Sequence, residues 1–328
     1  MPPTALVTGA TGCVGANVVA ALLARGYDVR AMRRATSSLE ALDGLAPELV
    51  VGDVLDPASL VAAMQGCALV FHIAAVADYW RTPTKRIYRV NVEGTRNVLT
   101  AALEAGIERL VYTSSVGALG VPPPGHLLDE SATFNLPPRR FPYGHSKHLA
   151  EQAVQEAVAQ GLDALIVNPT GVIGARDVHF IGGSVLREVR RGLFWFAPPG
   201  GLNWVDAKTA GLGHVLAAER GRTGERYVLG GQNVSHRVAI EIVAEVVGGR
   251  RPLLTLPRPL MSVVALLTDV FNAVWPGTPL FSGEQARLSG AEIYCDWSKA
   301  QRELGFPYTP FRAAVERAYA WYRARGYL

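Results

Sequence analysis

A tyrosine and a lysine one helical turn apart carry the clearest chemical signal in this sequence. Tyr143 and Lys147 occupy positions i and i+4 of a segment with helical character, so their side chains share one face. A phenol, with its usual pKa near ~10, is a weak acid–base group at neutral pH, and a nearby ammonium favours the phenolate. Bringing that pKa to neutrality requires roughly 4 kcal/mol of differential interaction. The pair therefore predicts a general acid–base, although the same spacing is also common on helix surfaces.

Hydroxyl side chains cluster at the end of a predicted strand over 109–113. Thr113 closes this strand, and Ser114 and Ser115 follow it. A hydroxyl at the carboxyl end of a strand can hold a substrate carbonyl or alkoxide beside the tyrosine. We expect Ser115 to do so; the alternative is that these hydroxyls only cap the turn.

A glycine-rich turn joins the first predicted strand to the first predicted helix. Residues 8–15 read Thr-Gly-Ala-Thr-Gly-Cys-Val-Gly. The first glycine permits a sharp turn, the second lets a pyrophosphate approach bare backbone, and the third lets the helix pack closely on the sheet. The helix N-terminus then offers free N–H groups and partial positive charge to phosphates. This predicts a dinucleotide site formed by Gly9, Thr11, Gly12, Cys13, Val14 and Gly15.

The end of the second predicted strand indicates which dinucleotide binds. An acidic residue there would hydrogen-bond the ribose 2′-hydroxyl of NAD, but strand 28–32 runs into Arg33 and Arg34. Two guanidinium groups can hold a 2′-phosphate, which favours NADP over NAD; the alternative is a pair of solvated arginines. After the third strand, Asp53 and Val54 are expected near the adenine, unless Asp53 only caps a helix.

Strands and helices alternate through the first half of the chain, which predicts an α/β fold with a doubly wound parallel sheet. Ligands of such sheets bind beyond the carboxyl ends of the strands. We assign residues 1–170 to a Rossmann domain that binds NADP, and 171–328 mainly to a smaller α/β substrate lobe, with segment 204–232 free to return to the first domain. The predicted strands are 4–8, 28–32, 49–51, 69–73, 109–113, 164–167 and 226–229, and the predicted helices include 14–25, 60–65, 90–105, 143–160, 207–219, 237–247 and 312–322.

Composition excludes several other classes of protein. Of 328 residues, 49% are hydrophobic and 18% charged, so the chain can form a folded core. The net charge of +4 is spread without basic runs interleaved with aromatics, so we expect no nucleic-acid partner. Three cysteines without a C-x-x-C pair indicate neither disulfides nor zinc, and His145 and His148 lack partners at metal spacing. Because the start carries no secretion signal, we expect a cytoplasmic protein.

One apolar stretch, from Leu260 to Trp275, requires a separate interpretation. It is too short to span a bilayer comfortably, and it contains Asp269 and Asn272. We therefore expect no membrane span, but a helix that is buried or covers a pocket. The alternative is a helix that lies on one face of a membrane.

Several motifs occur together in a fixed order. They lie at 8–15, 52–54, 72–75, 91–95, 113–115, 143–147 and 168–170. On these residues the chain resembles the extended branch of the short-chain dehydrogenase/reductase superfamily, and within it the dihydroflavonol-reductase-like and hopanoid-associated epimerase-like proteins. The resemblance covers most of the length and is strongest through Thr170.

This resemblance implies roles for individual residues. Ser115, Tyr143 and Lys147 match the catalytic triad, and Asn91 matches an asparagine that supports the site from a neighbouring helix. Such proteins often dimerise through two helices, which here correspond to 90–105 and 143–160. Residues expected beside the cofactor are His72, Ala74, Ala75, Thr113, Tyr143, Lys147, Asn168, Pro169 and Thr170.

The implied reaction interconverts a carbonyl and a secondary alcohol. NADPH gives a hydride to the carbonyl carbon, Tyr143 gives the proton, Ser115 hydrogen-bonds the oxygen, and Lys147 holds the nicotinamide ribose. The candidate pocket segments are rich in aromatic residues, which favours an apolar or aromatic small-molecule substrate. We expect Tyr79 and Trp195 to contact it.

Two other functions remain open. The first is a nucleotide-sugar epimerase that uses bound NAD(P); against it, Arg33 replaces the acidic ribose residue, and Leu119-Gly120 stands where sugar epimerases often have Tyr-Gly. The second is a redox sensor that binds NADP without turnover. Relatives of that kind typically lose the tyrosine or the lysine, and this chain keeps both Tyr143 and Lys147.

Overall fold

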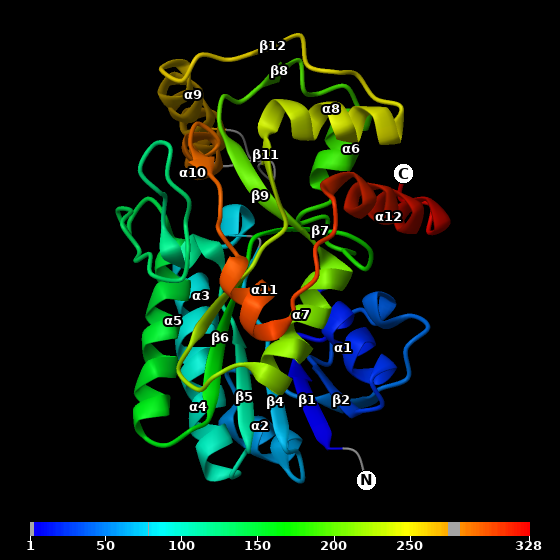
Figure 1. Ribbon diagram of the computed structural model, residues 1–328, viewed down its shortest axis with the longest axis vertical. Helices are drawn as coiled ribbons and strands as arrows, with labels where there is room; N and C mark the ends of the chain where they lie inside the picture. The colour runs from blue at the N-terminus through cyan, green and yellow to red at the C-terminus, as the bar shows by residue number, and fades with distance from the viewer. Residues whose placement is uncertain (1–2, 78, 275–282) are drawn as a thin grey trace.

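A seven-stranded parallel sheet forms the centre of the computed structural model, which describes residues 3–77, 79–274 and 283–328 (Figure 1). The strand order is β10-β6-β5-β4-β1-β2-β3. The chain thus extends the sheet outward from β1 in both directions, which confirms the predicted doubly wound α/β class. The strands are β1 Thr4–Thr8, β2 Asp28–Arg33, β3 Glu48–Val51, β4 Leu69–His72, β5 Arg109–Thr113, β6 Ala164–Pro169 and β10 Arg226–Leu229.

Helices cover both faces of this sheet because the strand side chains alternate in direction. Ala5 and Val7 of β1 pack in one core with α1 and α7, whereas Leu6 between them packs with α2, α4 and α5. These two cores fix the carboxyl ends of the strands at one edge, facing the second lobe (Figure 1). The helices are α1 Cys13–Ala24, α7 Ala207–Arg220, α2 Pro57–Met64, α4 Gly94–Glu104 and α5 Pro142–Ala159.

Part of the C-terminal half returns to this sheet. β10 pairs in parallel with β6. Helix α7 packs so closely on α1 that a Cβ on Gly211 would lie 2.5 Å from the backbone of Asn17. Helix α11 (Ser298–Leu304) adds Ala300 and Leu304 to the same core. Segments remote in sequence therefore complete the domain that carries the glycine-rich turn.

The remaining segments form a smaller α/β lobe beyond the carboxyl ends of the strands (Figure 1). Its central strand, β9, pairs antiparallel with β11 and parallel with β7 and β13. A separate core that includes Leu186, Val243 and Tyr322 holds it together. The elements are β7 Gly171–Ile173, β8 Phe196–Ala197, β9 Gly201–Asp206, β11 Gln232–Ser235, β12 Leu254–Thr255, β13 Glu292–Ile293, α6 Ser184–Arg190, α8 His236–Val247, α9 Leu260–Val274, α10 Gly283–Leu288 and α12 Phe311–Ala324.

The helix predicted over 90–105 is interrupted. Its first residues belong to a π-helical turn, η3 (Arg89–Glu93), which follows the short helix α3 (Thr84–Tyr88), and regular α-helix begins only with α4. A π-helical turn adds a residue to the helix repeat and is frequent at functional sites. Here it contains Asn91, one of the predicted site residues.

Helix α9 exposes apolar residues, so of the predicted alternatives, a helix that is buried or one that covers a pocket, the first is wrong. Leu267 is 63% exposed and Val274 is 80% exposed, whereas Met261 and Ala265 on the other face are buried. The outward face is therefore not part of a core, while the inner face packs on α10, which lines the cavity described below. Trp275 lies outside the described residues. Within the described ranges, no helix combines the length and hydropathy needed to cross a bilayer.

Candidate active site

The glycine-rich turn leaves one open approach at the N-terminus of α1. Gly9 adopts φ +68°, and a Cβ there would lie 2.6 Å from the backbone N of Ala74. A Cβ on Gly15 would lie 2.1 Å from the carbonyl O of Gly9. At Gly12, by contrast, the closest atom to such a Cβ is at 3.5 Å. A phosphate can therefore approach the backbone at Gly12 and the first N–H groups of α1.

Two arginines stand where β2 ends. Nη1 of Arg33 donates to the backbone carbonyls of Arg34 (3.3 Å) and Ala35 (3.1 Å), which fixes the guanidinium at the turn. Nε of Arg33 is buried and has no hydrogen-bond partner among the described residues, and Arg34 is exposed. A phosphate group could satisfy both guanidinium groups, so these residues fit a 2′-phosphate.

Asp53 after β3 and His72 at the end of β4 are both engaged in hydrogen bonds within the protein. Asp53 accepts a hydrogen bond from the N–H two residues further on (2.9 Å), as a cap does, and Val54 beside it is buried. His72 is fully buried between Thr8 Oγ1 (2.8 Å) and Thr95 Oγ1 (3.0 Å). Burial, and secondarily the Lys147 ammonium, lowers its pKa to about 3, so the imidazole is neutral. The ring of His72 is therefore enclosed by protein, whereas the sequence predicted it beside the cofactor. The following Ala74 and Ala75, predicted beside the cofactor as well, are partly exposed.

Ser115 and Tyr143 meet in a cavity of about 190 Å³. Ser115 precedes the turn η4 (Val116–Leu119), and its Oγ accepts a hydrogen bond from the N–H of Gly117 (3.1 Å). A Cβ on Gly144 would lie 2.5 Å from the carbonyl O of Gly117, so a glycine lets α5 approach this turn. The pKa of Tyr143 is raised by burial, and its hydrogen bond with Ser115 only partly opposes this rise.

Lys147 is held inside the protein below Tyr143 on the same helix. Its Nζ donates to the carbonyl O of Thr113 (2.7 Å) and lies 5.0 Å from the centre of the Tyr112 ring. Burial lowers the pKa of Lys147 to about 7, partly opposed by the Glu151 carboxylate. A buried ammonium with mainly neutral partners acts strongly on any acid placed beside it, because little solvent screens it.

Asn91 ties the segment after β4 to the first turn of α5. Its Oδ1 accepts from the N–H of Val76 (2.7 Å), and its Nδ2 donates to Ser146 Oγ (3.0 Å). Ser146 Oγ in turn donates to the carbonyl O of Tyr143 (2.7 Å). Asn91 thus acts on the site by positioning the backbone that carries the tyrosine.

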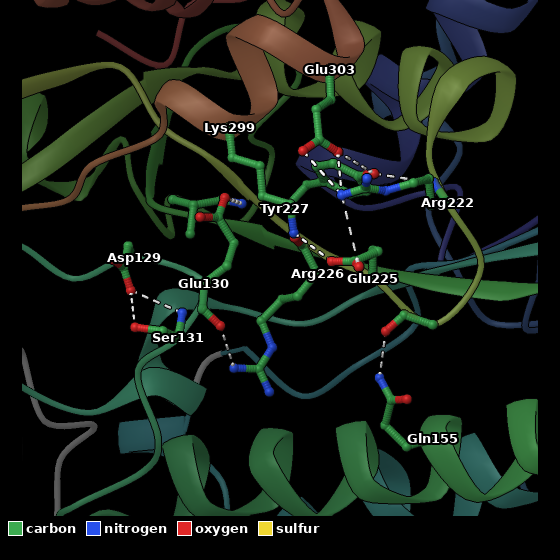
Figure 2. A network of polar contacts seen from close by, with 12 residues as sticks. Asp129, Glu130, Ser131, Gln155, Arg222, Glu225, Arg226, Tyr227, Lys299 and Glu303 are labelled. Carbon is green, nitrogen blue, oxygen red and sulfur yellow. Dashed lines mark hydrogen bonds and ion pairs between the residues drawn. The ribbon is translucent and has the colours of Figure 1, made fainter.

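A second buried network supports Ser115 from the other side. Nδ2 of Asn168 donates to the carbonyl O of Ser115 (3.0 Å) and to Glu151 Oε1 (2.6 Å). Arg226 pairs with the buried Glu151 carboxylate at 2.9 Å and donates to the carbonyl O of Glu130 (3.3 Å). Figure 2 shows the Arg226 side chain reaching from β10 past Glu130 toward α5. The returning strand β10 therefore helps to hold Ser115.

The second lobe supplies the other walls of the cavity. Among the described residues that line the cavity, Glu284 of α10 is the only one with a charged side chain. Burial raises the pKa of this carboxyl to about 8, partly opposed by Arg287. Glu284 also raises the pKa of Tyr143. The sequence reasoning missed Glu284 because no motif surrounds it. The remaining larger side chains in the lining are Val116, Leu136, Phe141, Thr170, Leu202, Leu288 and Ile293.

Trp195, one of the two aromatic residues predicted to contact substrate, is not brought to this cavity. Trp195 is 56% exposed, lies under the Arg250 guanidinium and does not line it. Tyr79 starts the turn η2 (Tyr79–Arg81), and its side chain lies outside the described part of the structure. Thr170 does line the cavity, and its Oγ1 is buried without a described partner. In the described ranges, no group of His, Cys, Asp and Glu could hold a metal ion.

Comparison with known proteins gives a consistent set of relatives. The model of the NAD dependent epimerase/dehydratase family matches residues 5–230. A putative dihydroflavonol 4-reductase of Synechocystis sp. is 39% identical over 98% of this chain and 95% of its own. The crystal structure of gox2253 aligns with a TM-score of 0.87 and 36% identity over 99% of both chains. That of PA4631, a nucleoside-diphosphate-sugar epimerase from Pseudomonas aeruginosa, aligns with a TM-score of 0.82 and 28% identity over 99% of both chains.

These matches agree with the geometry described above. The matched residues 5–230 include the glycine-rich turn and the Ser115, Tyr143 and Lys147 cluster. They support a nicotinamide-dinucleotide enzyme of the reductase and epimerase type. The chain belongs to the NAD dependent epimerase/dehydratase family, within the extended branch of the short-chain dehydrogenase/reductase superfamily.

Proposed function

We propose that this protein is an NADP(H)-dependent oxidoreductase that interconverts a carbonyl and a secondary alcohol on an apolar or aromatic small molecule. The observation that carries the proposal is the cavity in which Ser115 and Tyr143 meet, with Lys147 buried behind them and mainly apolar walls around them. Similarity to a putative dihydroflavonol 4-reductase supports the same class of reaction.

Each residue has a chemical task in this proposal. Tyr143 gives its proton to the developing alkoxide, or takes it back in the oxidation of an alcohol. Ser115 donates a hydrogen bond to the same oxygen and so stabilises the charge that develops there. The Lys147 ammonium holds the ribose next to the nicotinamide, and a positive charge beside the phenol favours the phenolate against the burial that raises the pKa of Tyr143. When bound, the nicotinamide supplies or accepts the hydride.

The choice of NADP rests on the end of β2. Arg33 offers a buried N–H without a described partner, and Arg34 offers an exposed guanidinium. These arginines stand where an acidic residue would select NAD. A 2′-phosphate satisfies these groups, whereas the 2′-hydroxyl of NAD leaves the positive charge unpaired.

The test is direct. The purified protein is titrated with NADPH and NADH and then given a panel of aryl ketones, aldehydes and secondary alcohols, while absorbance of the reduced cofactor is followed. We expect turnover with NADPH preferred, and a loss of about 10²–10⁴-fold in Tyr143→Phe. Tyr308→Phe, an exposed tyrosine outside the cavity, is the control. Near-normal turnover in Tyr143→Phe contradicts the proposal.

A sugar epimerase is the second candidate, favoured by similarity to PA4631. Such an enzyme would retain tightly bound NAD and show no net oxidation or reduction. The mainly apolar lining opposes a sugar diphosphate, because the described residues that line this cavity include no lysine or arginine to pair with the phosphates. Conversion of nucleotide sugars without net redox chemistry would replace the first proposal. Cofactor binding without turnover of either panel would favour the NADP-binding sensor.

A further inference from the structure

One end of the molecule exposes an unusual amount of apolar surface. On α9, large apolar side chains recur every three or four residues and form one outward stripe. The opposite face, with Met261 and Ala265, is buried. The helix is thus amphipathic, with its apolar side toward solvent. The exposed members are Leu260, Val263, Leu266, Leu267, Val270, Phe271 and Val274.

A second apolar segment lies at the same end. Strand β8 pairs with β12, and Figure 1 places both, with α9, at the end of the molecule opposite the N-terminus. We call the outward side chains of 193–196, 253–254 and 260–274 the apolar pole. It holds twelve of the twenty large apolar side chains that are exposed among the described residues. Those outside α9 are Leu193, Trp195, Phe196, Leu253 and Leu254.

The charge around the apolar pole is positive. Arg190, Arg191 and Arg250 are exposed, and the Arg250 guanidinium lies 5.7 Å from the centre of the Trp195 ring. The nearby acids already have arginine partners: Glu245 pairs with Arg251 and Arg312, Asp269 with Arg287, and Glu292 with Arg258. Arginines beside exposed leucine, tryptophan and phenylalanine are typical of surfaces that rest on anionic lipid headgroups.

We propose that the apolar pole docks on the surface of an anionic lipid bilayer, with α9 and the β8–β12 pair in the interface and the arginines on the headgroups. A second copy of this chain fits less well, because a two-fold interface would bring in the arginines of both copies while the nearby acids already have arginine partners. Helix α10 packs on the inner face of α9 and lines the active-site cavity through Glu284 and Leu288. Docking therefore brings the cavity wall close to the bilayer. Membrane docking is a property additional to the proposed reaction and does not depend on it.

Sedimentation with vesicles tests this directly. The purified full chain is mixed with vesicles of phosphatidylcholine and phosphatidylglycerol, or of phosphatidylcholine alone. We expect binding to the mixed vesicles and clearly weaker binding to phosphatidylcholine. Leu266→Ser/Leu267→Ser removes two apolar contacts and should weaken binding at least about tenfold. Arg250→Gln should weaken it about fivefold, on the mixed vesicles only.

Matched controls separate docking from misfolding and from self-association. Leu49→Ser/Val61→Ser removes two exposed apolar side chains far from the apolar pole and should leave binding unchanged. NADP(H) binding and the thermal midpoint of each variant report folding. Absence of wild-type binding to mixed vesicles overturns the proposal, as does equal binding of Leu266→Ser/Leu267→Ser. Light scattering that finds a wild-type dimer and a monomeric Leu266→Ser/Leu267→Ser variant, without vesicle binding, would assign this face to a second copy.

Discussion

The two sides of the active-site cavity are built differently. On the Rossmann side, Lys147, Asn91 and Asn168 are buried, and each is held by hydrogen bonds of 2.6 to 3.0 Å to its neighbours. On the lobe side, α10 is held on α9 through an Arg287–Asp269 pair whose side chains are both partly exposed. The groups assigned to proton transfer thus sit in a network that tolerates little displacement. The wall formed by α10 rests on α9, a helix with few buried residues, and we expect that this wall can be reshaped at low cost.

Replacing Lys147 with methionine tests the Rossmann side most severely. Methionine keeps most of the buried volume but removes the charge, so we expect kcat/KM to fall by about 10²–10⁴-fold. The thermal midpoint should hold or rise, because a buried ammonium with mainly neutral partners costs desolvation energy. Lys85→Met, at an exposed lysine, is the matched control. Parallel losses of activity and stability in Lys147→Met would show that the lysine is structural.

The buried ion pair behind Ser115 should matter next most. Glu151→Gln leaves Arg226 without its charged partner, and the partial exposure of Arg226 moderates the effect. We expect a loss of about 3 kcal/mol in the free energy of unfolding, measured with urea. We also expect a lower kcat, because the single amide oxygen of glutamine cannot accept from both Asn168 and Arg226. Glu241→Gln, in an exposed helical pair with Arg237, should leave stability unchanged. If the two variants behaved alike, the rigidity assigned to this side would be wrong.

At the cofactor end of the Rossmann side, we expect a substitution to change the preference for NADPH over NADH without abolishing activity. In Arg33→Ala, KM for NADPH should rise about tenfold while KM for NADH stays nearly constant, because only NADPH carries the 2′-phosphate. Arg86→Ala, at an exposed arginine on α3, controls for general charge effects. An unchanged ratio of the two KM values would mean that Arg33 and Arg34 are solvated.

The same contrast separates what the sequence could predict from what it could not. The strands of the large sheet and the residues Ser115, Tyr143 and Lys147 follow from local patterns: a glycine turn, a strand end, one helical face. Glu284 and the role of Arg226 could not be predicted, because both depend on which remote segments return to the site. Trp195 was misplaced for the related reason that aromatic content alone does not say which surface a side chain faces. The exposed face of α9 has the periodicity of a core helix, so its pattern could not distinguish burial from exposure.

On the lobe side, we expect Glu284 to have a smaller effect, which is a pH-dependent change in the stability of the protein. Burial raises the pKa of this carboxyl from 4.5 to about 8 in the folded protein, so the folded state binds more protons than the unfolded chain between these values. Stability attributable to Glu284 therefore falls as pH rises from 4.5 to about 8. We expect Glu284→Gln to gain thermal stability over the wild type across that range and to show no gain below it.

Activity should respond to the same substitution in a way that a structural role would not produce. Above about pH 8 the charged Glu284 opposes ionisation of Tyr143, whose pKa it raises. Alcohol oxidation needs the phenolate, so Glu284→Gln should move the alkaline rise of kcat to lower pH, while ketone reduction changes little at neutral pH. Glu292→Gln, at a partly exposed acid of the same lobe that pairs with Arg258, should leave both profiles in place. A pH profile of Glu284→Gln identical to that of the wild type would mean that the lobe wall shapes substrate choice alone and leaves the proton chemistry to the Rossmann side.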